Sequence, residues 1–423
     1  MSEWKNLTKS ELLEMKSAYD KKYEEFKGLG LKLDMSRGKP SPDLLDLSVG
    51  LIDAPPTWTA EDGTDARNYG VLNGVAECRR VFGDLLGIPE DLIIAGNNAS
   101  LELMYNAYMR LYCFGSLGSK PWKDLPNVKF LCPSPGYDRH FAISQAFGTE
   151  MITVPMTADG PDMDVVETLA RNDASVKGIW CVPLYSNPQG VVYSDETVRR
   201  LAQMPVAADD FRIFWDNAYG VHHIFEEHEI ADIFEYAKAV GNWDRIYYFF
   251  STSKVTLPGG GTGMMAASPA NVAEQLRHMS IQTIGPDKLD QLRMAHYLKN
   301  AEGIRTRMRM LGALLRPKFE IVLDILEREL GGTGLVSYIK PKGGYFIAID
   351  TLEGCAKAVV AMAKEAGATL TGAGATYPYG RDPRDTNIRI APTYPSTEEL
   401  GKAMELLCLC VKRVSLEKLL AEK

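Results

Sequence analysis

The chain has 423 residues, of which 45% are hydrophobic and 24% are charged, and its formal net charge is −8 at pH 7. This composition excludes intrinsic disorder and predicts a folded protein of two or three domains. The negative charge argues against nucleic acid as the main partner, because phosphate backbones are bound by basic surfaces. No apolar run approaches the roughly 18 residues of a membrane span, so no membrane partner is expected.

The cysteines and the N-terminus indicate a reducing compartment. The seven cysteines are an odd number and include no Cys-x-x-Cys pair. A long chain with this pattern fits neither a disulfide framework nor a zinc site. The first residues, MSEWKNLTKSELLEMK, are too charged for a signal peptide. We therefore expect a cytoplasmic protein.

The first predicted element is an amphipathic helix over residues 8–27. Thr8 and Glu11 have the spacing of a capping box, and Gly28 follows the last apolar position. Residues 32–48 contain two prolines and are expected to form an extended connection.

From about residue 70 the pattern alternates between helices and short apolar runs. Helices are predicted over residues 74–86 and 100–114. Six apolar runs are typical of buried strands, at residues 128–133, 151–156, 176–184, 212–219, 245–253 and 263–268. Strands that alternate with helices predict an α/β fold of three layers, in which helices cover both faces of a mostly parallel sheet.

After about residue 285 the pattern changes. Residues 288–330 are predicted to be helical, with Pro317 at a helix start or a kink. A hairpin-like stretch, a helix, a strand and a final helix follow, at residues 334–350, 356–367 and 387–392 and from Ser396. We expect residues 1–50 to be an N-terminal arm that joins residues 306–423 in a smaller α+β domain. Residues 51–305 would then form the large domain.

Two motif groups do not lead to a function. The glycine-rich run at residues 259–263 lacks the G-x-G-x-x-G spacing of a dinucleotide site. His222, His223 and His228 lie close together in sequence, and Asp232 could join them, but an exposed loop or helix explains this cluster better than a metal site. No metal is expected.

Four features occur in order along the chain: Asn187-Pro-Gln-Gly, Asp216-Asn-Ala-Tyr219, Ser251-Thr-Ser253-Lys254 and Asn387-Ile-Arg389. Each of the first three sits at the end of a predicted strand, and ligands gather at the carboxyl ends of strands in an open α/β sheet. Each feature alone is a common turn, cap or loop, but the ordered set is harder to explain structurally.

Pyridoxal-phosphate chemistry unifies the four features. A lysine amine can form a Schiff base with an aldehyde cofactor. A carboxylate keeps the pyridine nitrogen protonated, so that the ring can act as an electron sink. An amide and a tyrosine hydroxyl can bind the ring phenolate, hydroxyls and a helix N-terminus can bind the phosphate, and an arginine can bind a substrate carboxylate.

On these motifs the chain resembles the fold-type I pyridoxal-phosphate aminotransferases of class I/II. It is most similar to the aspartate aminotransferase subgroup with the N-terminal signature LDMSRGKPSPDLLDLS and the STSK loop. The resemblance covers nearly the whole chain and implies the following roles. Lys254 is the Schiff-base lysine, Asp216 is the pyridinium partner, Asn187 and Tyr219 bind the phenolate, Asn187 also lies at the substrate, and Arg389 and Gly38 bind the substrate α-carboxylate.

The resemblance also implies further cofactor contacts. The turn Asn98-Ala99-Ser100 precedes a helix and matches the phosphate-binding turn of the family, and the hydroxyls of Ser251 and Ser253 join it. Tyr137 is the aromatic plate on the pyridine ring. Tyr69 matches a tyrosine that reaches the phosphate of the neighbouring subunit, which implies a homodimer with shared active sites.

One position departs from the family. The family usually has an arginine eight residues after the lysine, where this chain has Thr262. The phosphate must then be neutralised in another way, and Arg37 is one candidate.

Three hypotheses follow. The first is a ping-pong aminotransferase, in which Lys254 moves the proton between the substrate and the cofactor. The second keeps the cofactor for another reaction, such as a β-lyase or a decarboxylase, because one fold serves many reactions. The third, an aminotransferase-like regulator without catalysis, is disfavoured, because one helix before the signature leaves no room for a winged-helix domain.

The substrates implied by the subgroup are aspartate or glutamate with 2-oxoglutarate. A broad-specificity or aromatic aminotransferase remains the alternative. A dicarboxylic substrate needs a second cation for its side chain. Arg37 is our first choice, and Lys39, Arg139 and Lys120 are the other basic residues near the motifs.

Overall fold

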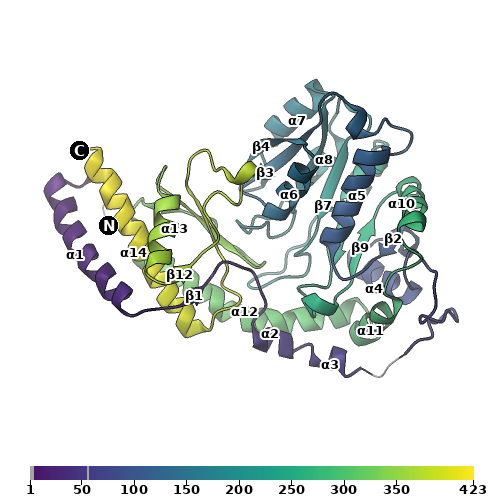
Figure 1. The fold of residues 1–423 in the computed structure, drawn as a ribbon, viewed down its shortest axis with the longest axis horizontal. Helices are drawn as coiled ribbons and strands as arrows, with labels where there is room; N and C mark the ends of the chain where they lie inside the picture. The colour runs from purple at the N-terminus through teal and green to yellow at the C-terminus, as the bar shows by residue number, and fades with distance from the viewer. Residues whose placement is uncertain (1–3, 55–56) are drawn as a thin grey trace.

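The computed structural model describes residues 4–54 and 57–423. These residues form two lobes (Figure 1). The long helix α12 (Ala301–Leu330) passes along the junction, where it contacts α4 (Ala76–Leu86) of the larger lobe and α14 (Thr397–Ala421) of the smaller one.

The larger lobe is built on a sheet that has eight strands within the described residues, in the order β2-β9-β8-β7-β6-β3-β4-β5. The five strands from β8 to β4 are parallel, and the outer pairs are antiparallel. The strands are β2 (Ile93–Ala95), β3 (Lys129–Ser134), β4 (Glu150–Thr157), β5 (Gly160–Pro161), β6 (Val176–Cys181), β7 (Arg212–Asp216), β8 (Ile246–Ser251) and β9 (Gly263–Ala266).

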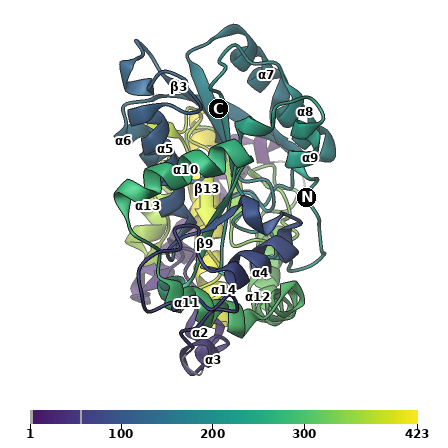
Figure 2. The ribbon, with the colours of Figure 1, turned by 90° about the vertical axis from the view of Figure 1, so that its right-hand side faces the viewer.

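Helices cover both faces of this sheet, so that each strand alternates between two cores. On β7, Ile213 and Trp215 pack into one core, and Phe214 packs into the other. The first core takes side chains from α4, α7 (Met163–Asn172), α8 (Asp195–Gln203) and α9 (Ile233–Lys238). The second takes them from α5 (Ser100–Phe114), α6 (Asp138–Ala146) and α10 (Pro269–Gln282), and Figure 2 shows α10 crossing in front of the sheet. Burial on both faces explains why the central strands are continuously apolar.

The smaller lobe joins both ends of the chain. Strand β1 (Leu33–Asp34) pairs in parallel with β12 (Ala368–Thr369), and α1 (Lys9–Gly28) packs along α14 (Figure 1). A second sheet has the order β10-β11-β13 and is antiparallel. Its strands are β10 (Val336–Ser337), β11 (Ile347–Thr351) and β13 (Asn387–Ile390), and α13 (Ala356–Glu365) packs between α14 and these elements.

The remaining helices are short. They are α2 (Pro42–Asp46), α3 (Val49–Ile52), α11 (Lys288–Leu298) and 3₁₀ turns at Trp4–Asn6, Glu90–Leu92, Trp122–Asp124, Trp243–Arg245, Pro258–Gly260 and Pro378–Gly380. Within the described residues, no helix is both long and apolar enough to cross a membrane.

The predicted fold class is confirmed: a mostly parallel sheet lies between two helical layers, and a smaller α+β unit comes from both chain ends. The predicted capping box at Thr8 forms, and Ser396 caps the final helix in the same way. Thr8 accepts from the Glu11 N–H, and Ser396 accepts from the Glu399 N–H. The exact limits 1–50, 51–305 and 306–423 stay a proposal, which is supported by the α1–α14 contact and by the position of α12 across the junction.

One prediction about local structure was wrong, and one alternative of a second was wrong. Residues 32–48 are not one extended connection, because α2 begins at Pro42, where proline is compatible with the first turn of a helix. Pro317 was expected at a helix start or a kink, and it does not start a helix, since it lies inside α12. The break in the helical region 288–330 falls at Lys299, whose φ is +67°, and Asn300 then caps α12 by accepting from the Gly303 N–H.

Candidate active site

The parallel strands bring the predicted residues to one edge of the sheet. Asp216 is the last residue of β7, and Ser251 is the last residue of β8. Lys254 follows β8 by three residues, and Asn187 follows β6. Because β6, β7 and β8 run in the same direction, these side chains gather at their shared carboxyl edge.

Asp216 is a buried carboxylate with one oxygen left free. Its Oδ2 lies 3.0 Å from Nε2 of His140, whereas its Oδ1 is buried and has no hydrogen-bond partner among the described residues. A buried carboxylate oxygen without a donor is costly, so the site is built to receive an N–H or O–H group here.

His140 was not among the predicted site residues, and it holds Asp216 in place. Its ring stacks on Trp180 at a centroid distance of 4.4 Å, and Tyr137 meets it edge-on at 4.9 Å. The only sequence signal was its position three residues after Tyr137, on the same helical turn.

Lys254 presents its amine to the ring of Tyr219, with Nζ 5.0 Å from the ring centroid. Burial lowers the pKa of Lys254 below its ordinary value, and the charge of Asp216 opposes this shift. The amine donates no hydrogen bond to a described residue. Lys254 therefore holds less of its charge than an exposed lysine and is better suited to act as a nucleophile and base.

His222 fixes the backbone next to this amine. Its Nε2 lies 3.2 Å from the carbonyl oxygen of Lys254, so Nε2 carries the proton and donates it. Burial, followed by the neighbouring charge of Lys254, lowers the pKa of His222 to about 3, and the ring is neutral at physiological pH. The sequence favoured an exposed loop or helix over a metal site for this histidine, but His222 is buried. Its contact to a backbone carbonyl leaves no signal in the sequence.

The other members of the histidine cluster have structural partners. The hydroxyl of Tyr185 lies 2.7 Å from Nδ1 of His223, and Nε2 of His228 lies 3.3 Å from Oε2 of Glu226. Asp232 caps α9 by accepting from the Phe234 N–H. No group of three His, Cys, Asp or Glu side chains within residues 4–54 and 57–423 is arranged to hold a metal ion.

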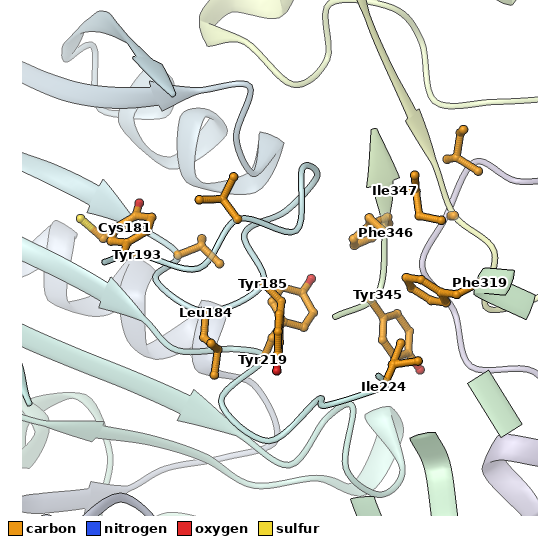
Figure 3. Packing of buried hydrophobic residues seen from close by; sticks show 14 of the residues in the cluster. Cys181, Leu184, Tyr185, Tyr193, Tyr219, Ile224, Phe319, Tyr345, Phe346 and Ile347 are labelled. Carbon is orange, nitrogen blue, oxygen red and sulfur yellow. The ribbon is translucent and has the colours of Figure 1, made fainter. Parts of the chain in front are cut away.

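Aromatic rings line the junction between the lobes at this site. Figure 3 shows Tyr185 and Tyr219 of the larger lobe facing Tyr345 and Phe346 of the smaller one. The rings of Tyr219 and Tyr345 are nearly parallel, with centroids 6.5 Å apart. Burial raises the pKa of Tyr219 well above its ordinary value and that of Tyr137 to about 12, so both hydroxyls stay protonated.

A turn suited to an anion lies beside Lys254. Helix α5 begins at Ser100, and no side chain caps its first turn, which leaves backbone N–H groups directed outwards. The hydroxyl of Ser253 donates to the carbonyl oxygen of Asn98 at 3.2 Å, and that of Ser251 donates to Ser253 at 3.2 Å. The predicted residues Asn98, Ala99, Ser100, Ser251 and Ser253 are thus brought together.

Two neighbours shape this turn. Gly263 lets β9 pass close to it, because a Cβ at that position would lie 2.7 Å from the Ser100 nitrogen. Thr262 is buried, and its Oγ1 has no partner among the described residues, while its N–H donates to Oγ1 of Thr252 at 2.9 Å.

Arg389 reaches the site from β13 of the smaller lobe. Its Nη1 lies 3.4 Å from Oδ1 of Asn187 and 3.3 Å from Oδ1 of Asp138, and its Nη2 donates to Oγ1 of Thr371 at 3.1 Å. The guanidinium also lies over the ring of Phe346, 4.9 Å from its centroid. Its Nε is buried and has no partner among the described residues.

Gly38 belongs to the same corner. A Cβ at Gly38 would lie 2.5 Å from Cζ of Phe346, so only glycine allows the backbone to pack against this ring. The signature segment is thereby placed next to the aromatic ring over which Arg389 lies.

Other predicted residues are not brought into this cluster. The side chain of Tyr69 is 80% exposed, and its hydroxyl makes no hydrogen bond to a described residue. Arg37 is exposed near Asp34, and Nζ of Lys39 lies 5.6 Å from the ring centroid of Tyr394. Lys120 follows the C-terminal end of α5, a helix of 15 residues whose opposite end begins at Ser100. About 22 Å of helix separates these ends, so Lys120 lies away from the site.

Comparisons with known proteins identify the family of this chain. Residues 7–423 match the family described as aspartate amino-transferase. An aspartate aminotransferase of Corynebacterium glutamicum is 46% identical over 92% of this chain and 91% of its own length. A crystal structure of an aspartate transaminase from the same species superposes with a TM-score of 0.96, with 43% identity, and covers 98% of this chain and 99% of that one.

A more distant structure shares the fold. The α-aminoadipate aminotransferase of Thermus thermophilus, in complex with N-(5'-phosphopyridoxyl)-L-leucine, has a TM-score of 0.74 at 21% identity, covering 93% of this chain and 94% of that one. On the family match and the closer relatives, the chain belongs to the aspartate amino-transferase family and is an aminotransferase.

Proposed function

We propose that this aminotransferase binds pyridoxal 5'-phosphate at the carboxyl edge of its sheet and transfers the amino group of aspartate or glutamate to a 2-oxo acid such as 2-oxoglutarate. The proposal rests on two groups that occur in one site. They are the buried Oδ1 of Asp216, which has no hydrogen-bond partner among the described residues, and the amine of Lys254 over the ring of Tyr219. The relatives named above support an amino-transfer reaction, and the name of the Corynebacterium enzyme supports aspartate.

The residues present fit this cofactor. Oδ1 of Asp216 is a buried acceptor without a donor, which is what a protonated pyridine nitrogen needs. The uncapped start of α5 and the hydroxyls of Ser251 and Ser253 suit a phosphate. Tyr137 packs against His140, the partner of Asp216, and is the proposed plate on the pyridine ring.

When bound, the cofactor supplies an electron sink for the bond that breaks at the substrate Cα. Lys254 anchors it and later moves a proton at Cα, for which its lowered pKa provides the free amine. Asp216 holds the ring proton, while Asn187 and the protonated Tyr219 hydroxyl bind the phenolate. Lys254 is partly buried at this site, which limits the access of water to its amine.

The substrate α-carboxylate is proposed to bind Arg389. A guanidinium recognises a carboxylate through two parallel hydrogen bonds, and Asn187 and Thr371 orient it for this contact. The backbone of Gly38, packed on Phe346, completes the same corner.

For the side-chain carboxylate of the substrate, Arg37 and Arg139 are the remaining candidates. Arg139 follows Asp138 on α6, and its charge acts on the hydroxyl of Tyr137. Arg37 adjoins Gly38. Lys39 already lies near Tyr394, and Lys120 lies at the far end of α5.

A panel of amino donors tests this function. With 2-oxoglutarate as acceptor, we expect aspartate turnover to exceed alanine and phenylalanine turnover by at least about tenfold in kcat/KM, because a second charged contact discriminates strongly. Arg139→Gln or Arg37→Gln should lower the aspartate rate while sparing alanine, and Lys120→Gln is the matched control. Equal rates for apolar and acidic donors would contradict the dicarboxylate assignment. Release of ammonia without glutamate formation would contradict amino transfer and favour a β-lyase.

The site is further proposed to be shared within a homodimer. Exposed apolar side chains lie on α3, on residues 58–69 and from the end of α10 to the start of α11, and α3 contacts α11. They are Val49, Ile52, Trp58, Tyr69, Ile281, Ile284 and Leu289. Lys288 of α11 donates to the carbonyl oxygen of Gly70. The Asp287 N–H donates to Oδ1 of Asn97, which precedes the proposed phosphate-binding turn Asn98–Ser100. An apolar surface of this kind is typical of an interface, and it would carry Tyr69 to the phosphate of a second copy.

Complementation between inactive chains tests the shared site. Lys254→Ala and Tyr69→Ala should each be inactive alone, yet an equimolar mixture should regain roughly a quarter of the wild-type sites, since one of the two sites in each mixed dimer is intact. Activity is measured after subunit exchange has been demonstrated by mass spectrometry. If exchange occurs without rescue, Tyr69 does not serve the partner's site.

A further inference from the structure

Asp138 makes an ion pair with the arginine that is proposed to bind substrate. Its Oδ1 lies 3.3 Å from Nη1 of Arg389 across the junction of the lobes. Asp138 is the first residue of α6, directly after Tyr137, and its side chain is 35% exposed, whereas Arg389 is 8% exposed. The guanidinium of Arg389 is thus already in contact with a carboxylate of the protein before a ligand carboxylate binds.

We propose that the carboxylate of Asp138 competes with the α-carboxylate of the ligand for Arg389. This competition weakens the binding of every substrate and product. This inference rests on the proposed function, in which Arg389 receives that carboxylate. In this inference Asp138 sets the affinity for all ligands alike and does not distinguish one substrate side chain from another.

The contacts of Arg389 favour competition over anchoring. The guanidinium is already oriented by neutral groups: Asn187, Thr371 and the ring of Phe346. Asp138 adds a single contact to one nitrogen, without the two parallel bonds of a strong arginine–carboxylate pair. Removing it leaves the position of Arg389 defined and its positive charge uncompensated.

Asp138 also has a favourable alternative when it leaves Arg389. At the first position of α6 its carboxylate faces the positive end of the helix dipole, and its partial exposure gives it water as a partner. The cost of displacement by a substrate is therefore small but present, as for other partly exposed ion pairs. We therefore infer that Asp138 raises the dissociation constants of all carboxylate ligands by a similar factor.

The test compares Asp138→Asn with Asp195→Asn in the holoenzyme. Asp195 is also the first residue of a helix, α8, which like α6 has nine residues. It makes no contact with Arg389, so its loss reports only the helix-terminal effect. Asp138→Ser is a second variant, should the amide disturb the turn at Tyr137.

Succinate is the probe for binding, with its Kd measured by calorimetry, and KM is measured for aspartate, alanine and 2-oxoglutarate. Asp138→Asn and Asp138→Ser should lower the Kd of succinate and all three KM values by about three- to tenfold, with little change in kcat, because the α-carboxylate contact persists through the reaction. Asp195→Asn should change none of them.

The outcomes separate the inference from the function on which it rests. Unchanged values in the Asp138 variants would overturn the inference, and a raised Kd would show that Asp138 anchors Arg389. An effect on aspartate alone would make Asp138 a reader of the side chain and also contradict the inference. Arg389→Lys should weaken every ligand, and if it does not, the assignment of Arg389 in the proposed function fails instead.

Discussion

The Lys254→Ala variant is expected to lose the visible absorbance of the bound cofactor and at least about 10⁴-fold of its turnover while keeping its fold. The reason is that the same amine forms the covalent linkage and then moves the proton. In the structure this amine lies over the ring of Tyr219, 5.0 Å from its centroid. Absorbance, turnover and circular dichroism of the purified variant measure the three expectations.

Lys123→Ala is the matched control for the loss of a lysine, because Lys123 is exposed and lies in the 3₁₀ turn Trp122–Asp124, before the start of β3. It should retain both the absorbance and the rate. An active Lys254→Ala enzyme with intact visible absorbance would mean that another group carries the linkage, and the assignment of Asp216, Tyr219 and Asn187 would fall with it.

Asp216→Asn is expected to lower turnover by about 10²–10⁴-fold while leaving part of the cofactor bound. Asparagine keeps the size of the side chain, but it removes the charge that favours a protonated ring nitrogen. The loss should appear in the proton-transfer half-reaction, followed by stopped-flow absorbance with aspartate alone, more than in the KM for aspartate.

Asp210→Asn provides a control with a buried carboxylate at the other end of β7. Asp210 accepts hydrogen bonds from Lys177 and from the indole of Trp122, so its loss should lower the melting temperature and spare the rate of the folded enzyme. If Asp216→Asn turns over as fast as the wild type, a different residue holds the ring nitrogen.

The site residues that could be predicted from the sequence are those whose position follows from the pattern of a neighbouring strand or helix. Asp216 and Ser251 end apolar runs that only a buried strand explains, and parallel strands must end on one edge. The helix that starts at Ser100 was predicted from its pattern, but the role of Asn98–Ser100 beside that edge came from the family resemblance.

The unpredicted residues act through partners that are distant in sequence. His140 meets Asp216 across 76 residues, and Asp138 meets Arg389 across 251. His222 binds a backbone carbonyl, for which any polar donor would serve. None of these contacts leaves a periodicity or a motif in the sequence, because each depends on how the sheet and the two lobes are assembled.

The predictions of local structure failed where a proline is compatible with two different backbone structures. The prolines of residues 32–48 favoured an extended segment, yet Pro42 occupies the first turn of α2, where its missing N–H costs nothing. Pro317 was expected at a helix start or a kink, and α12 continues through it. Ile304, Leu311, Leu315 and Phe319 are buried on either side of Pro317 and hold the helix in place. Tertiary packing overrides the local preference at this position.

The most direct test of the central claim is to find the residue that carries the cofactor. The purified wild-type protein is reduced with borohydride, digested and mapped by mass spectrometry. The account predicts a phosphopyridoxyl group on the single peptide that contains Lys254, and its absence from that peptide in Lys254→Ala. A phosphopyridoxyl group on any other lysine, or on none, would contradict it.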